Sequence, residues 1–245
     1  MISHRTGWVR HNAFGLRREW LDLYFADLQG WDRSSNLGNR QVESLKTWLK
    51  TAGIEDENGH LTELGERCAA EGTACLYLWE LLWVNVVFNF PTACWYVHLG
   101  NGEWTTTELK AQLRAAVPRL AEWTASNAIM ELAGLLERTP VGGELGQGYV
   151  QRGRPRRLIR RGIEPCDVAL IHALGRLYLQ HDQTRIAWND DLTWPWVVFG
   201  CSRQFVLERL TILDQNHFDI DEQGIIFRTT DREWWLCGNM MTTLL

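Results

Sequence analysis

One short segment, residues 151–162, reads QRGRPRRLIRRG and holds six arginines. Guanidinium groups this close repel one another, so they require negatively charged partners. The chain cannot bury six such groups unpaired, and their partners are either the protein's own carboxylates or phosphates from outside. We favour phosphates because the segment is expected to lie in a linker between two candidate DNA-binding units. The expected phosphate-binding residues are Arg154, Arg156, Arg157 and Arg160.

A second candidate site combines His11 with Arg17. On one continuous helix these side chains would point about 120° apart, so only a loop or a bend would bring them together. The stretch HNAFG can form such a loop, in which His11 acts as an acid or base and Arg17 binds a phosphate. The alternative is a buried structural Arg17 with His11 as its hydrogen-bonded neighbour.

Two carboxylate clusters, Asp190 with Asp191 and Asp219 with Asp221 and Glu222, have the chemistry to hold a hard cation such as Mg²⁺. Alternation along FDIDEQG places Asp219 and Asp221 on one face of a strand. Acidic residues beside a turn are more often simply solvated, and NDD before an apolar run also fits the start of a helix or strand. The metal ligands therefore stay unassigned.

Glu108-Leu109-Lys110 has the E-x-K spacing of one nuclease class. Thr105 and Glu108 also match the T-x-x-E capping box, in which both side chains satisfy backbone groups at the start of a helix. The capping box explains Glu108 without any catalytic role, and we prefer it.

The composition is that of a soluble globular protein with one or two domains: 245 residues, 45% hydrophobic and 22% charged. The formal net charge is -5, and it becomes -11 without the six arginines of the segment, so charge is strongly segregated along the chain. Only 3 of the 25 basic residues are lysines, so arginine is preferred over lysine throughout this sequence and not only in this segment. Six scattered cysteines without a C-x-x-C pair indicate reduced thiols in a cytoplasmic protein.

The most apolar stretch, residues 74–99, is long enough to cross a membrane but contains Glu80, Asn85, Asn89 and Pro91. We therefore expect a buried helix to about residue 88, a break before Pro91 and a second buried segment after it.

The remaining patterns predict a mainly α fold with short β-hairpins. Apolar residues recur at helical spacing from Val42 to Leu49, and the turn DENG separates that helix from another that begins near Thr62. Helix, tight hairpin, helix is the order of a winged helix. Near the C-terminus SRQFVLERLTIL and NHFDIDEQGIIFRT predict a helix followed by a hairpin, and so a second winged-helix-like unit.

Three parts of the chain follow from these elements. Residues 1–138 are expected to form a helical domain with the first winged-helix-like unit, and residues 163–245 the second such unit. Five glycines and two prolines near the arginine-rich segment predict a Gly/Arg-rich linker over 139–162. In the first unit, the helix of residues 41–51 is expected to face DNA, through Arg40, Gln41 and Ser44.

The order of short motifs along the chain resembles a family of unknown function found in DNA phosphorothioation operons. HNAFGLRREWL is similar to the family's H-x-x-F-x-x-R-x-x-W-L opening, and the similarity continues through LGNRQVESLKTWLKTAGI with HLTELGE, GTACLYLWELLWVN with ACWYV, EWTTTEL and FDIDEQGIIFR. The chain departs from the family in the short turn NLGNRQ and in the arginine-rich segment.

This resemblance implies a cytoplasmic DNA-binding protein that nicks DNA to allow sulfur incorporation, with His11 and Arg17 as candidate catalytic residues. Cleavage of a phosphodiester most often uses Mg²⁺ held by carboxylates, so Mg²⁺ is the cofactor expected for that activity. Its implied partners are DNA, a cysteine desulfurase, an ATP-using component and a sulfur-transfer protein, with no membrane. Two alternatives stay open: a non-catalytic DNA-binding adaptor or transcriptional regulator, and a scaffold that binds only proteins.

Overall fold

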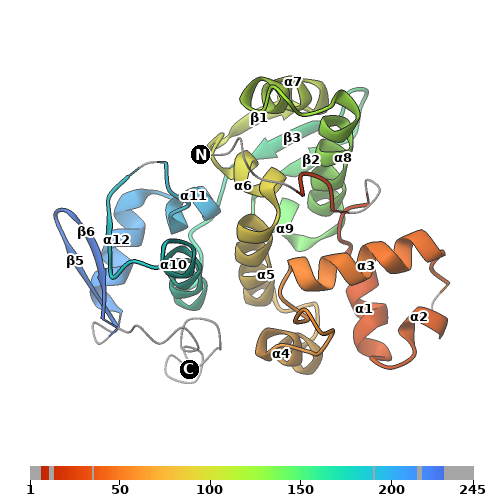
Figure 1. Cartoon of the computed structure of the whole chain (residues 1–245), viewed down its shortest axis with the longest axis horizontal. Coiled ribbons are helices and arrows are strands. Elements are labelled where there is room, and N and C mark those ends of the chain that lie inside the picture. The colour runs from red at the N-terminus through yellow and green to blue at the C-terminus, as the bar shows by residue number, and fades with distance from the viewer. Residues whose placement is uncertain (1–6, 11–13, 35, 190, 214–216, 229–245) are drawn as a thin grey trace.

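The computed structural model describes residues 7–10, 14–34, 36–189, 191–213 and 217–228. This part of the chain is mainly helical, as the sequence predicts, and it contains two small antiparallel sheets of three strands each where only short hairpins were expected (Figure 1). The helices are α1 (Arg18–Ala26), α2 (Trp31–Ser34), α3 (Asn39–Thr51), α4 (Glu63–Glu71), α5 (Leu76–Asn89), α6 (Pro91–Val97), α7 (Thr106–Ala116), α8 (Glu122–Arg138), α9 (Pro140–Gly143), α10 (Asp167–His181), α11 (Pro195–Phe199) and α12 (Arg203–Ile212). The strands are β1 (Gly102–Thr105), β2 (Tyr149–Gln151), β3 (Arg157–Arg160), β4 (Arg185–Ala187), β5 (Phe218–Asp221) and β6 (Gly224–Phe227).

The two helices predicted on either side of the DENG turn are α3 and α4. The hydroxyl of Thr62 accepts a hydrogen bond from the Gly65 N–H at 3.1 Å and so caps α4. Between the helices, Glu55 and Leu61 form an isolated β-bridge instead of a paired hairpin. The first winged-helix-like unit is therefore not confirmed.

The apolar stretch folds as two buried helices, α5 and α6, that meet at Phe90. Pro91 occupies the first turn of α6, where its missing N–H leaves no hydrogen bond unmade, so the predicted break is confirmed. None of the helices in the described ranges is long and apolar enough to cross a membrane.

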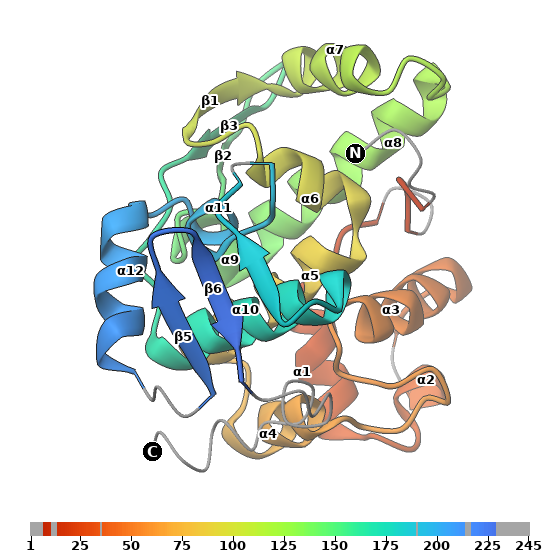
Figure 2. The same ribbon diagram turned by 60° about the vertical axis from the view of Figure 1, so that its left-hand side comes forward.

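The linker expected over residues 139–162 is not confirmed, because these residues form α9, β2 and β3. Strand β3 lies at the centre of the first sheet, between β1 and β2, with Trp104 opposite Leu158 and Val150 on the other side of Leu158. Leu158 is buried in the main hydrophobic core. The segment is thus a structural part of the N-terminal region, in which β2 packs against α8 (Figure 2).

The C-terminal unit runs in the order α10, β4, α11, α12, β5, β6, and its sheet has the order β4-β6-β5. Its own hydrophobic core includes Leu174, Ile186, Leu210 and Ile225. The predicted helix and hairpin are present as α12 and β5–β6. Ser202 caps α12 by accepting from the Phe205 N–H at 3.1 Å.

Helices α5 and α10 lie side by side and join the C-terminal unit to the rest of the protein (Figures 1 and 2). The polar residues of the apolar stretch make this contact. The amide of Asn85 lies 3.0 Å from Nε2 of His172, and Asn89 Oδ1 accepts from Arg176 at 2.5 Å. Glu80 accepts the backbone N–H of Cys166 at 2.9 Å, just before α10 begins.

Candidate functional site

The arginine-rich segment forms the β2–β3 hairpin. Its turn is held against the start of α7, where the Thr106 N–H donates to the carbonyl of Arg156 at 2.9 Å. Side chains alternate along β3, so Leu158 and Arg160 point into the protein and Arg157 points outward. The hairpin therefore divides its arginines between the interior and the surface.

Arg160 is buried, with 1% of its surface exposed. Its guanidinium donates to Gln147 Oε1 and to four backbone carbonyls. These carbonyls belong to Val97, Gly100, Val197 and Val198, at 2.8 to 3.1 Å. Burial lowers the pKa of Arg160 to about 10, which still leaves it charged at neutral pH. Its donors are occupied by the protein, so Arg160 holds the structure together and is not the exposed phosphate-binding residue that the sequence suggested.

Three of the outward arginines pair with carboxylates of the same region. Arg152 and Arg156 flank Glu137 at 3.1 and 3.4 Å, and Arg157 forms an ion pair with Glu103 of β1. The Arg157–Glu103 pair is solvent-exposed and contributes little to stability, whereas Glu137 is only 17% exposed and is shared by two arginines. The structure therefore supports, for part of the segment, the alternative that the arginines pair with the protein's own carboxylates.

Arg154 and Arg161 are exposed and form no ion pair with any residue that the structure describes. Together with Arg152, Arg156 and Arg157 they make up what we call the basic surface. Residues 102–161 as a whole carry ten basic and six acidic side chains, a net charge of +4 within a protein of net charge -5. The positive charge of the hairpin is thus only partly balanced by its surroundings.

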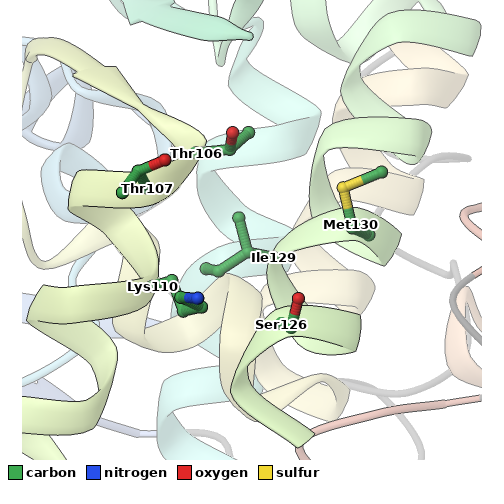
Figure 3. A pocket seen from close by; sticks show the side chains of 6 residues that line it. All are labelled: Thr106, Thr107, Lys110, Ser126, Ile129 and Met130. Carbon is green, nitrogen blue, oxygen red and sulfur yellow. The ribbon is translucent and has the colours of Figure 1, made fainter. Parts of the chain in front are cut away.

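An open pocket of about 110 Å³ lies between α7 and α8 (Figure 3). Its polar lining is Thr106, Thr107 and Lys110 from α7 and Ser126 from α8, as Figure 3 shows. The three hydroxyl groups make no side-chain hydrogen bond with the described residues. Thr106 both lines the pocket and donates its backbone N–H to the carbonyl of Arg156, so the pocket lies next to the hairpin.

The predicted DNA-facing residues of α3 are only partly exposed. Arg40 is exposed at the start of the helix, whereas Gln41 accepts the Gly38 N–H at 3.0 Å and so caps its own helix. Ser44 is fully buried and donates to the carbonyl of Phe14 at 3.3 Å. Ser44 therefore contacts the core and is not a DNA-binding residue in this structure.

His11 lies outside the described residues, so its predicted pairing with Arg17 stays a prediction. Arg17 precedes α1 in extended conformation, and its guanidinium lies 4.5 Å from the centre of the Trp20 ring. Partial burial and then the nearby charge of Arg138 lower the pKa of Arg17, and Glu19 acts in the opposite sense.

Two of the carboxylates proposed for a metal, Asp219 and Asp221, are occupied by other contacts. Asp219 pairs with Arg228, and Asp221 pairs with Arg185 while it closes the β5–β6 turn by accepting from the Gly224 N–H at 2.9 Å. Glu222 and Asp191 are exposed, and Asp190 lies outside the described residues. Within the described ranges, no three His, Cys, Asp or Glu side chains gather closely enough to hold a metal ion.

The E-x-K pair is likewise explained by structure. Glu108 Oε2 accepts the Thr105 N–H at 2.7 Å, and Thr105 Oγ1 accepts the Glu108 N–H at 3.1 Å, which confirms the capping box. These hydrogen bonds lower the pKa of Glu108. Lys110 pairs at 3.2 Å with Glu122 at the start of α8. Glu108 and Lys110 therefore serve different contacts.

Sequence reasoning did not identify the α7–α8 pocket, because Ser126 is 16 residues beyond Lys110 and nothing local marks the two as neighbours. Sequence reasoning used Glu80, Asn85 and Asn89 only as evidence against a membrane span. It did not predict that they bind α10 and the residue before it. Compared with known proteins, the chain matches no family model, no curated protein and no solved structure.

Proposed function

We propose that the protein binds DNA through the basic surface of the β2–β3 hairpin. The observation that carries this proposal is the partly unbalanced charge of the hairpin, where Arg154 and Arg161 have no carboxylate partner among the described residues. A nucleic-acid backbone supplies a regular row of negative charges, and arginine binds phosphate oxygens with two parallel hydrogen bonds.

The ion pairs of Arg152, Arg156 and Arg157 are compatible with this role. The Arg157–Glu103 pair lies at the surface, where water and salt weaken it, so a phosphate can take the place of Glu103 at small cost. The side chain of Glu137 is only 17% exposed, but Arg152 and Arg156 share it, so a phosphate can bind one arginine while the other stays paired with Glu137. DNA bound there would also reach Lys110 at the α7–α8 pocket.

We further propose that residues 167–228 form a winged-helix unit. The order helix, strand, helix, helix, strand, strand with the sheet order β4-β6-β5 supports this assignment. Residues 163–245 carry six basic and twelve acidic side chains, a net charge of -6 that opposes phosphate binding. This unit is therefore better suited to contacts with a protein partner than to contacts with DNA.

The nicking activity, Mg²⁺, the phosphorothioation partners and the cytoplasmic location stay predictions that rest on the family resemblance. Supercoiled plasmid incubated with the protein and Mg²⁺ separates the two proposed roles. A nickase converts it to open circles, and His11→Ala abolishes the conversion while DNA binding is retained. A DNA-binding adaptor shifts the plasmid in a gel and leaves it supercoiled.

Salt dependence tests DNA binding itself. Each phosphate neutralised on duplex DNA contributes about -0.9 to the slope of log affinity against log salt. Replacing Arg154 and Arg161 together by alanine should flatten that slope by about two and leave the melting temperature unchanged, because both side chains are exposed.

In the matched control, Arg185 and Arg228 of the C-terminal unit are replaced by alanine, which removes the same number of positive charges. It should leave the slope within error of the unmodified protein. An equal slope in the Arg154/Arg161 variant and the unmodified protein would remove the basic surface from the interface.

A further inference from the structure

One large aromatic side chain stands out on the same region. Trp123, in the first turn of α8, is 68% exposed, although the structure buries most of its other described tryptophans. Met130, seven residues later on nearly the same helix face, is 38% exposed. Leaving these groups in water forfeits the free energy of their burial, which suggests that the α8 face is covered by a ligand in use.

The surroundings of Trp123 are polar and basic, not those of an apolar docking patch. Ser126, one turn along α8, and Met130 both line the α7–α8 pocket. Glu122, the neighbour of Trp123, accepts ion pairs from Lys110 at 3.2 Å and from Arg114 at 3.7 Å. Two cations of α7 therefore share the one carboxylate of the residue that precedes Trp123.

The same pocket leads to the hairpin through Thr106, whose N–H binds the carbonyl of Arg156. An aromatic face, a pocket with free hydroxyl groups and a basic surface thus follow one another along this region. Proteins that bind single-stranded nucleic acid combine these same features, because bases stack on aromatic rings while cations follow the phosphates.

We propose that the groove between α7 and α8 binds a single strand of nucleic acid, with one base stacked on Trp123. A phosphate of that strand contacts Lys110 and the hydroxyl groups of Thr106, Thr107 and Ser126 (Figure 3). The strand must be single because bases within a duplex stack on one another and offer no free face. This inference rests on the proposed DNA binding and specifies the form of DNA that the site takes.

The test measures affinity for a fluorescently labelled oligothymidine of about ten nucleotides by anisotropy. Trp123→Ala should weaken binding about tenfold, whereas Trp123→Phe should retain most of it because phenylalanine keeps a ring for stacking. The melting temperature should not change, since the side chain is exposed. Ile212→Ala is the matched control, because Ile212 is an equally exposed apolar residue (72%) on α12, and it should bind normally.

A second oligonucleotide with the same phosphates but abasic sites in place of thymines isolates stacking. The unmodified protein should bind this oligonucleotide about tenfold more weakly than oligothymidine. The Trp123→Ala variant should bind the two oligonucleotides with nearly the same affinity, because it has no ring on which a base can stack. Equal affinity of Trp123→Ala and the unmodified protein for oligothymidine would overturn the stacking site. If the Arg154/Arg161 variant still lowers DNA affinity in that case, the proposed DNA binding stands without it. If the unmodified protein binds neither duplex nor oligothymidine, both proposals fail and Trp123 belongs to a protein contact.

Discussion

The two three-stranded sheets are of similar size but differ in how their arginines are used. In the C-terminal unit Arg185, Arg209 and Arg228 each pair with an aspartate, and the unit is acidic overall. In the region of residues 102–161 the arginines outnumber their carboxylate partners, and Arg154 and Arg161 are left without one among the described residues.

Arginine content alone therefore does not locate an interface in an arginine-rich chain. An arginine with a nearby aspartate has its charge largely neutralised and offers little to a distant phosphate. The useful quantity is the excess of cations over the carboxylates within reach, and that excess is found at the β2–β3 hairpin.

The largest effect of a single substitution on stability is expected at Arg160, the buried arginine of the hairpin. Arg160→Met should lower the free energy of unfolding by about 3 kcal/mol or more, because several buried carbonyls lose their donor together. Urea denaturation measures this loss. Arg161→Met, at the next position and exposed, is the control and should change stability by less than about 0.5 kcal/mol. Similar stability of the two variants would show that Arg160 is not a structural residue.

The role of Arg160 could have been read in part from the sequence. Alternation along RLIR places Leu158 and Arg160 on the same face of a strand, and an apolar face is normally the buried one. The glycines and prolines on either side favoured a linker instead. Strand β3 depends on β1, more than 50 residues earlier, and such non-local pairing leaves no local signal in the sequence.

Features that depend on neighbouring residues were predicted well. The Thr105–Glu108 capping box, the break before Pro91 and the cap at Thr62 each involve groups within four residues of one another. Ser44 shows the limit of this reasoning: its polar side chain suggested a surface position, yet it is buried because Phe14 supplies a backbone carbonyl to bind.

The next largest effect is the acid sensitivity of the contact between α5 and α10, which joins the two regions. Burial, and then the charge of Arg176, lower the pKa of His172 to about 3, so His172 is neutral in the folded protein. The unfolded chain binds a proton near pH 6.5, so stability is complete above that pH and declines as the pH falls from 6.5 towards 3. The loss of stability at pH 4.5 that depends on His172 should be about 2.7 kcal/mol, which is two pH units at about 1.36 kcal/mol each.

His172→Gln removes this titration and keeps a side chain that can bind Asn85. Urea denaturation at pH 7 and pH 4.5 should therefore show a smaller acid loss in His172→Gln than in the unmodified protein. His181, at the exposed end of α10, provides the control in His181→Gln, which should retain the full loss because its pKa is lowered less by burial. An identical acid loss in all three proteins would mean that the contact between α5 and α10 does not depend on a neutral His172.

The smallest effect is a change in duplex affinity, which tests whether the acidic C-terminal unit contacts DNA. Replacing Asp219 and Asp221 together by asparagine frees Arg228 and Arg185 and changes the net charge of residues 163–245 from -6 to -4. Each lost pair is largely exposed and should cost at most about 1 kcal/mol of stability. If DNA binds only at the basic surface, the changed charges lie on the other sheet, and salt screens their effect with a Debye length of about 8 Å at physiological ionic strength. Duplex affinity measured at that salt should then rise by less than about twofold. A tenfold rise would mean that arginines released on β4 and beside β6 reach phosphates themselves, and the functional difference between the two sheets would be lost.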